Sequence, residues 1–118
     1  MVENKKIKEL RWLGNSRKTI LKFPDSVKKT FGTALFFAQN GGRYPDTKMM
    51  KGLGSGVYEI LEDHRSDTYR AVYTVKFKNC VYVLHVFQKK SKSGIKTPKE
   101  EVDLIKSRMK MAQELENE

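Results

Sequence analysis

The sequence predicts an α+β fold, in which helices pack on one antiparallel sheet. Three observations support this class. Residues 27–38 have helical apolar spacing, residues 56–87 contain three strand-like segments joined by short turns, and residues 97–112 return to helical spacing. The chain has 118 residues, 38% of them hydrophobic, which suits one domain over residues 1–118 with a modest core.

The N-terminal segment is expected to form a short strand and a short helix. Residues 7–13 (IKELRWL) are a strand candidate that stops at Gly14. Residues 15–23 (NSRKTILKF) have room for one or two helical turns, with Asn15 or Ser16 as the N-cap.

A longer helix is expected to begin after Pro24 and to pack on the sheet. Five apolar residues recur at the spacing of one helical face: Val27, Phe31, Ala34, Leu35 and Ala38. Phe36 and Phe37 widen this apolar side. Residues 40–42 (NGG) provide the glycine that commonly ends a helix.

Residues 41–56 are expected to form a long loop with room for one helical turn. The segment is rich in glycine and contains Pro45, and loops of this length in small domains are often functional. Its GLGSG run (52–56) does not qualify as a phosphate-binding loop. It follows no strand, precedes no helix and lacks the GK[ST] ending.

Three strands are expected next, over residues 56–63, 67–77 and 80–87. Successive side chains of the first two fall on opposite faces, such as Val57, Glu59 and Leu61 against Tyr58, Ile60 and Glu62 in the first. The connections HRSD and KN are short enough for antiparallel hairpins. The third, CVYVLHVF, is almost wholly apolar, which favours a central position in the sheet.

The last element is a predicted helix that begins with a capping box. Residues 97–100 (TPKE) place Thr97 at the N-cap, proline at the first helical position and Glu100 three residues after the cap. Four apolar residues then share one face: Val102, Ile105, Met109 and Ala112. The acidic end, residues 113–118, is expected to fray.

Several classes of protein are disfavoured by composition. No apolar run is long enough to span a membrane, and the charged N-terminus lacks the apolar core of a signal peptide, so we expect a cytoplasmic protein. The single cysteine, Cys80, permits no intrachain disulfide and is expected to be buried and inert.

Metal and cofactor sites are not predicted. The two histidines, His64 and His85, and the one cysteine show no metal-ligand spacing. Glu59, Glu62 and Asp63 are interpreted as a solvated strand face rather than a magnesium site.

The charge indicates a polyanionic partner. The net charge is +10, and residues 1–56 carry 12 basic and 4 acidic side chains whereas residues 57–118 carry 12 and 10. An excess of this size favours nucleic acid or an acidic protein as partner, although it is also compatible with a basic surface that binds nothing.

Basic residues near the strand ends point to RNA chemistry. RNA can be cut without a metal when the 2′-OH attacks the adjacent phosphate. The enzyme must then remove a proton, stabilise charge on phosphorus and assist the leaving 5′-oxygen. Lysines and arginines can stabilise that charge, His64 could transfer the proton, and aromatic rings such as those of Tyr69 and Phe87 could stack on a base.

Three blocks, in this order and spacing, resemble a known family: MKGLGSGVYEI (50–60), DTYRAVY (67–73) and YVLHVFQKKSKSGIKTP (82–98). Over about residues 45–110, and more weakly over the helix at 25–39, the chain resembles the HigB-type, phage-derived branch of the RelE superfamily. These toxins of type II toxin–antitoxin systems are ribosome-dependent mRNA endonucleases. The resemblance implies a curved antiparallel sheet with helices on one face, an N-terminal strand and a C-terminal helix.

The resemblance also implies the site residues and partners. The implied catalytic residues are His64, Arg65, Arg70, Lys89 and Lys90. The implied RNA-binding residues are Lys48, Lys51, Phe87, Lys92 and Lys96. The implied partners are mRNA in the ribosomal A site and an antitoxin, commonly a helix-turn-helix protein, through which operator DNA would be bound.

Two departures from the family keep other functions open. The C-terminal helix has no tyrosine, and no histidine lies near the C-terminus, although different family members use one or the other in catalysis. His85 lies within a strand and is expected to be a packed histidine. The alternatives are a non-catalytic RNA- or ribosome-binding module, and a degenerate phage-derived protein kept for binding a partner.

Overall fold

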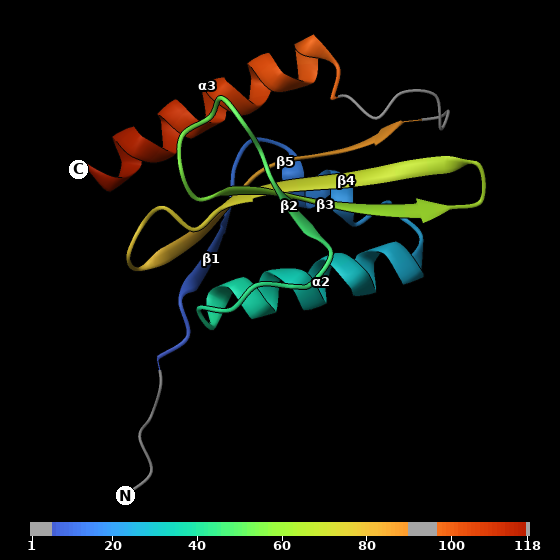
Figure 1. The fold of residues 1–118 in the computed structure, drawn as a ribbon, viewed down its shortest axis with the longest axis horizontal. Coiled ribbons are helices and arrows are strands. Elements are labelled where there is room, and N and C mark those ends of the chain that lie inside the picture. Colours follow the sequence, from blue (N-terminus) through green and yellow to red (C-terminus); the bar gives the residue numbers. More distant parts are fainter. Residues whose placement is uncertain (1–5, 90–96, 118) are drawn as a thin grey trace, which may run out of the picture.

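Five strands form one sheet in the computed structural model, which describes residues 6–89 and 97–117 (Figure 1). The strands are β1 (Glu9–Trp12), β2 (Thr47–Met49), β3 (Val57–His64), β4 (Asp67–Thr74) and β5 (Cys80–Lys89). Their order across the sheet is β1-β5-β4-β3-β2. All neighbours are antiparallel except β1, which runs parallel to β5. The predicted α+β class is confirmed, but the sheet is mixed rather than purely antiparallel.

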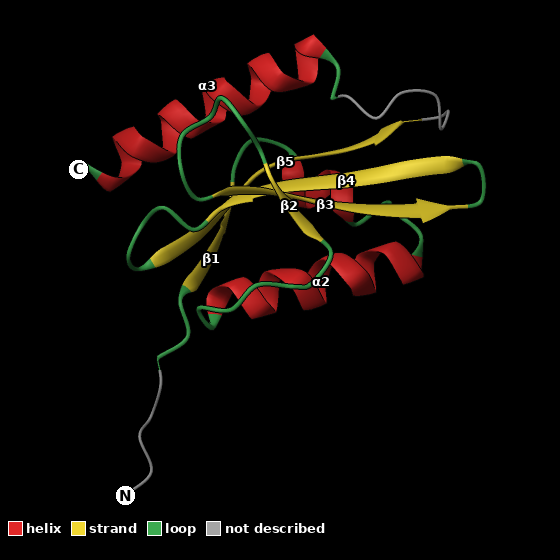
Figure 2. Cartoon of the chain, in the orientation of Figure 1, coloured by secondary structure: helices red, strands yellow, loops and turns green. Residues whose placement is uncertain are grey.

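Helices cover both faces of the sheet (Figure 2). The short α1 (Ser16–Ile20) and the longer α2 (Asp25–Gln39) contribute Ile20 and Phe31 to one core, whereas α3 (Lys99–Glu116) contributes Ile105 to a second core. The expectation that all helices share one face is therefore wrong. Burial on both faces explains why the side chains of the interior strands β4 and β5 are nearly all buried.

The core under α2 follows the predicted helical face. All five residues of that face are buried, and they meet strand residues such as Ile60 and Val83. Phe36 and Phe37 do not widen this face, because they are 54% and 40% exposed. Phe37 instead packs edge-to-face on Tyr44 with 5.7 Å between ring centroids.

The core under α3 depends on an irregularity in β5. Val72 pairs with His85 and Tyr73 pairs with Val83, so Leu84 is an extra residue in the ladder. Leu84 and Phe87 both belong to the α3-side core, whereas Val83 and Val86 belong to the α2-side core. Cys80 is buried as expected, and burial raises the pKa of its thiol.

Three local expectations are wrong. Residues 47–49 of the expected loop form the edge strand β2. The helix α3 begins at Lys99 after Pro98, without a side-chain cap, so the capping box does not form. The acidic end stays helical to Glu116, whose carboxylate accepts a 2.6 Å hydrogen bond from the Tyr82 hydroxyl.

The position of β5 was predicted only in part. It is an interior strand flanked by β1 and β4, but β4 occupies the middle of the sheet. Within residues 6–89 and 97–117, no helix is long and apolar enough to cross a membrane.

Candidate active site

The α3-side face of the sheet brings several of the predicted residues together. Lys48 on β2 lies opposite Glu59 on β3, and Arg70 on β4 lies opposite Phe87 on β5. Because facing residues in antiparallel strands share a face, strand register alone places Lys48 beside Glu59 and Arg70 beside Phe87.

A cleft of about 500 Å³ opens between the β2–β3 edge and the start of α3. Its lining residues come from three segments: Lys48, Met49, Met50, Lys51, Glu59, Thr97 and Val102. Lys48 and Lys51 are exposed, whereas Glu59 is only 6% exposed. The cleft therefore combines two accessible ammonium groups with one recessed carboxylate.

A buried network holds this carboxylate in place. The Glu59 Oε2 atom lies 3.5 Å from Nη1 of Arg70, whose side chain is 2% exposed. The Thr97 hydroxyl donates to the same carboxylate oxygen at 3.1 Å and accepts from Arg70 Nη1 at 3.1 Å. Thr97 thus links the segment before α3 to the sheet instead of capping the helix.

This arrangement meets the chemical needs of RNA cleavage. A carboxylate in the cleft can accept the proton of a 2′-hydroxyl, and ammonium groups at the rim can neutralise a phosphate and its developing charge. Arg70 is too deeply buried to contact a ligand in this geometry, so its direct effect is on the orientation of Glu59.

A second polar cluster lies deeper under α3. His85 is 6% exposed, and its Nε2 atom lies 2.6 Å from the Glu101 carboxylate. Its Nδ1 atom lies 3.1 Å from Nη1 of Arg108, which also donates to the backbone carbonyl of Leu84 at 2.9 Å. The ring of Phe87 stacks on His85 with 5.0 Å between centroids.

The partners of His85 define its protonation. A guanidinium can only donate, so Nδ1 must accept, and the proton lies on Nε2 facing Glu101. Burial lowers the pKa of His85, which outweighs the opposite effect of Glu101, and the nearby Arg108 lowers it further. His85 is therefore a neutral, packed imidazole at neutral pH, in line with the sequence-based interpretation.

Two of the predicted catalytic residues lie away from the cleft: His64 at the end of β3 and Arg65 in the β3–β4 turn. The His64 Nδ1 atom lies 3.3 Å from the hydroxyl of Ser26 on α2, and its ring contacts Tyr69 of the α2-side core. Arg65 is exposed and has a positive φ of 58° in the turn. The structure thus does not bring His64 together with Arg70 and Lys48.

The remaining predicted residues belong to the end of β5 and the segment after it. Lys89 is half-buried and pairs with Thr68 at the end of the strand. Lys90, Lys92 and Lys96 lie outside the described residues.

Four residues with a role in these clusters were missed in the sequence: Glu59, Thr97, Glu101 and Arg108. Glu59 was interpreted as part of a solvated face. The signal for burial was available, because Glu59 lies two residues after Val57 in a strand and therefore on the same face as this apolar residue. Arg108 falls on the apolar face of α3, three residues after Ile105 and four before Ala112, which also marks it as buried.

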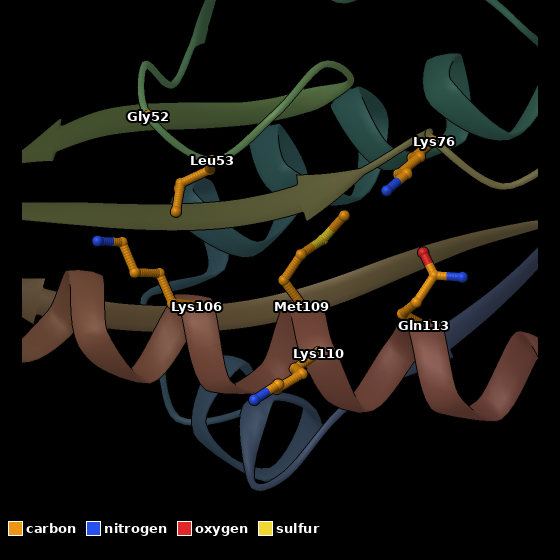
Figure 3. A pocket seen from close by; sticks show the side chains of 7 residues that line it. All are labelled: Gly52, Leu53, Lys76, Lys106, Met109, Lys110 and Gln113. Carbon is orange, nitrogen blue, oxygen red and sulfur yellow. The ribbon is translucent and has the colours of Figure 1, made fainter.

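A second, basic groove lies beside α3 and contains no carboxylate (Figure 3). Lys106, Met109, Lys110 and Gln113 project from the helix, and Leu53 and Lys76 lie on facing segments. Such a groove can contact phosphate but supplies no proton acceptor. In the described part of the chain, no group of three or more His, Cys, Asp or Glu residues is arranged to hold a metal ion.

Comparison with known proteins bears on family and fold. Residues 18–110 match the family described as phage derived protein Gp49-like. Among solved structures, the chain is similar to a double arginine-to-alanine mutant of the E. coli toxin RelE in the free state. The TM-score is 0.59 at 23% sequence identity, over 86% of this chain and 97% of that chain. No curated protein sequence matches the chain. The likeness confirms the RelE-like fold.

Proposed function

The chain belongs to the Gp49-like family of phage-derived proteins, and we propose that it is the toxin of a type II toxin–antitoxin module. Its activity in this proposal is that of a HigB-type endoribonuclease, which cuts mRNA in the ribosomal A site and thereby inhibits translation in the cytoplasm. The RelE-like fold supports the proposal, because the similar structure is that of a toxin.

The observation that carries the proposal is the cleft that Glu59 lines together with Lys48 and Lys51. A proton acceptor and two cations in one opening of about 500 Å³ match the requirements of metal-independent RNA cleavage. A binding surface for RNA alone needs the cations and would use the recessed carboxylate only as a structural link.

The proposed reaction is attack of a 2′-hydroxyl on the adjacent phosphorus. Glu59 accepts the hydroxyl proton, the 2′-oxygen bonds to phosphorus, and the bond to the 5′-oxygen breaks. Lys48 and Lys51 neutralise the charge on the phosphate, and one ammonium group supplies the proton to the leaving 5′-oxygen. The products are a 2′,3′-cyclic phosphate and a 5′-hydroxyl end.

The other basic residues receive supporting roles. Arg70 is proposed as a positioning residue that orients Glu59, and Phe87 as a packing partner of His85 rather than an exposed stacking platform. Arg65, Lys89, Lys90, Lys92 and Lys96 are proposed to contact phosphates of mRNA or ribosomal RNA, which makes activity fall with increasing salt. His64 has no part in the proton transfer.

The proposed partners follow from the same role. The toxin pairs with an antitoxin, of the helix-turn-helix type in this branch, and operator DNA is bound through the antitoxin. A second candidate function is a non-catalytic ribosome-binding module. The observation in its favour is that Glu59 contacts both Arg70 and Thr97. A glutamate whose role is only to link the segment before α3 to the sheet would make the same contacts.

The test is mRNA 5′-end mapping in a purified translation reaction, with and without ribosomes. New ends that appear only with ribosomes and in frame with codons support the proposal. Glu59→Gln should reduce their formation by about 100-fold or more. Glu62→Gln is the matched control, because Glu62 lies on the same strand opposite Tyr69 of the α2-side core.

Two outcomes would contradict the proposal in different ways. Wild-type cleavage by the Glu59→Gln variant would remove Glu59 from the reaction while leaving the enzyme class intact. Blocked translation without any new mRNA ends would establish the non-catalytic alternative.

A further inference from the structure

The basic charge of the first half of the chain is not explained by the cleft. Among the described basic residues of that half, Lys48 and Lys51 are the two that line it. Between residues 17 and 29 there are five basic side chains and one acidic side chain: Arg17, Lys18, Lys22, Lys28 and Lys29 against Asp25. These residues belong to α1, to the start of α2 and to the link between them.

This basic segment adjoins an apolar groove of about 210 Å³. The groove lies between strand β1, helix α1 and helix α2, and its lining is mostly apolar: Leu10, Trp12, Arg17, Ile20, Leu21, Lys28, Gly32 and Leu35. Leu21 at its border is 61% exposed. Phe36, one helical turn beyond Gly32, is 54% exposed. Exposed apolar groups of this size beside an apolar groove are typical of an interaction site.

The groove is separate from the cleft. Its lining residues come from β1, which is the edge strand opposite to β2, and from the α1 and α2 segments. Figure 1 shows that α2 covers the face of the sheet opposite to α3. The cleft lies at the β2 edge on the α3 side. A residue that lines the groove therefore can be changed without touching the cleft.

The chemistry of the groove favours a protein segment over RNA. Its volume suits one or two apolar side chains, and apart from Trp12 its floor is aliphatic or glycine, so it offers no platform for successive bases. Two basic residues, Arg17 and Lys28, also line the groove. Lys28 already pairs with Asp25 at 3.1 Å, so it can exchange one exposed carboxylate for another.

We propose that this groove docks an acidic amphipathic segment of a protein partner. One apolar side chain of the segment enters the groove between Trp12 and Gly32, and its carboxylates face Arg17 and Lys28. The identification of this partner as the antitoxin rests on the proposed function, whereas the chemistry of the segment rests on the groove alone.

Gly32 allows the groove to be filled without disturbing the core. A Cβ atom built at Gly32 meets no other atom within 4 Å, and the residue lies in the exposed middle of α2. Gly32→Trp should therefore fold and obstruct the groove, and Gly32→Ala controls for the change in helix propensity. Arg17→Glu tests the charge, with Lys106→Glu on α3 as the matched reversal at a distant exposed lysine.

The experiment is a calorimetric titration of the full chain with the protein encoded by the adjacent gene. We expect Gly32→Trp and Arg17→Glu to weaken binding at least 10-fold, and Gly32→Ala and Lys106→Glu to leave it within about 2-fold. Raising the salt concentration should shrink the effect of Arg17→Glu but not that of Gly32→Trp.

The possible results separate this inference from the proposed function. Groove variants that bind as tightly as wild type, or a wild-type chain that does not bind the adjacent protein, would overturn the docking site. The docking site would also be overturned if the Gly32→Trp variant lost binding to a poly-uridine RNA but bound the adjacent protein as the wild type does. The 5′-end mapping is carried out without the partner, so mRNA cleavage and docking succeed or fail independently.

Discussion

At the scale of single residues, Glu59 and Arg108 are charged groups at positions that ordinary periodicity assigns to the apolar core. Each is buried with polar partners, as the cost of burying a lone charge requires. The two differ in their surroundings. Glu59 also lines the cleft, whereas Arg108 lies under α3 and donates to the Leu84 carbonyl and the Asn15 side chain. This difference is why the proposed reaction uses Glu59, whereas Arg108 is given a structural role.

His85 is expected to make stability depend on pH. Its pKa is lowered in the folded state by burial, so the unfolded chain binds a proton more readily. The neutral, buried His85 therefore contributes fully to the free energy of unfolding above the unfolded pKa of about 6.5. This stability is lost as the pH falls from there toward the lowered pKa of the folded state. Urea denaturation at pH 7.5 and 5.5 should show a smaller loss for His85→Gln than for wild type.

The control for this prediction is the other histidine. His64 lies half-buried beside Ser26 and Tyr69, outside the Glu101–Arg108 environment. A His64→Gln variant measures what the same substitution does to the pH dependence at a site that lacks these partners. An equal loss of stability in wild type and His85→Gln would show that other groups dominate this pH range.

How far the site could be predicted depends on the kind of signal. Lys48, Arg70 and Phe87 were assigned from the resemblance, and strand register does bring them to one face. The face of His64 was not predictable, because it depends on where the β3–β4 turn begins and on contact with Ser26, 38 residues away. The contact between Glu59 and Thr97, in the segment before α3, was also not predictable. Thr97 is remote from Glu59 in the sequence, and its position before a proline resembles that of a helix cap.

At the scale of elements, α3 is attached to the sheet by polar contacts along its whole length. Thr97 binds Glu59 just before its start, Arg108 binds Leu84 and Asn15 in its middle, and Glu116 binds Tyr82 at its end. The Asn15 side chain therefore accepts a hydrogen bond from Arg108 instead of capping α1. The helix is consequently held in one position on the sheet, which also sets the width of the cleft.

Loss of the central contact should destabilise the domain. Arg108→Met leaves the Leu84 carbonyl, His85 and Asn15 without their donor, at a cost of about 2 kcal/mol in the free energy of unfolding. Gly14 has a φ of 57°, and a Cβ atom there would lie 2.5 Å from Nη2 of Arg108. Gly14→Ala should therefore also destabilise, both by strain and by displacing Arg108.

A double-mutant cycle checks this connection. If Gly14→Ala acts partly through Arg108, its cost in urea denaturation should be smaller in the Arg108→Met background. Lys110→Met, an exposed change on the same helix, should stay within about 0.5 kcal/mol of wild type. Fully additive costs at Gly14 and Arg108 would contradict the coupling.

Helix α2 contains an opportunity for stabilisation. Gly32 lies in the helix interior, where alanine is favoured by about 1 kcal/mol, and the space beside it is open. Gly32→Ala should raise the thermal midpoint by about 4 °C in calorimetry. A lower midpoint would mean that the glycine relieves crowding, which would also weaken the case for the open groove.

The elements themselves were predicted unevenly. Long periodic segments such as α2 and α3 were recognised because burial of one face imposes a pattern on many residues. The strand β2 was missed, because three residues at a sheet edge between glycine-rich stretches carry too little pattern. The placement of helices on both faces was also missed, since a helical stripe shows that a face is buried but not against which side of the sheet.

At the scale of the whole molecule, the proposed cleft and the proposed docking groove occupy opposite edges and opposite faces of the sheet. Basic residues line both, so under the two proposals the net charge of +10 is divided between two surfaces. This proposed division accounts for the basic first half of the chain, although all five implied catalytic residues lie in the second half.

The division predicts a specific salt dependence of RNA binding. Each phosphate neutralised on a single strand contributes about −0.7 to the slope of log K against log salt concentration. With the Glu59→Gln variant to prevent cleavage, replacement of Lys48 and Lys51 by alanine should make the slope shallower by about 1.4. Replacement of Lys18 and Lys22 beside the groove removes the same charge and should leave the slope nearly unchanged. Fluorescence anisotropy of a labelled single-stranded RNA measures the slope for both pairs of variants.

Equal changes of the slope for the two pairs would mean that RNA binding responds to the total charge and not to the cleft. Long-range attraction depends on net charge, whereas counterion release depends on contact.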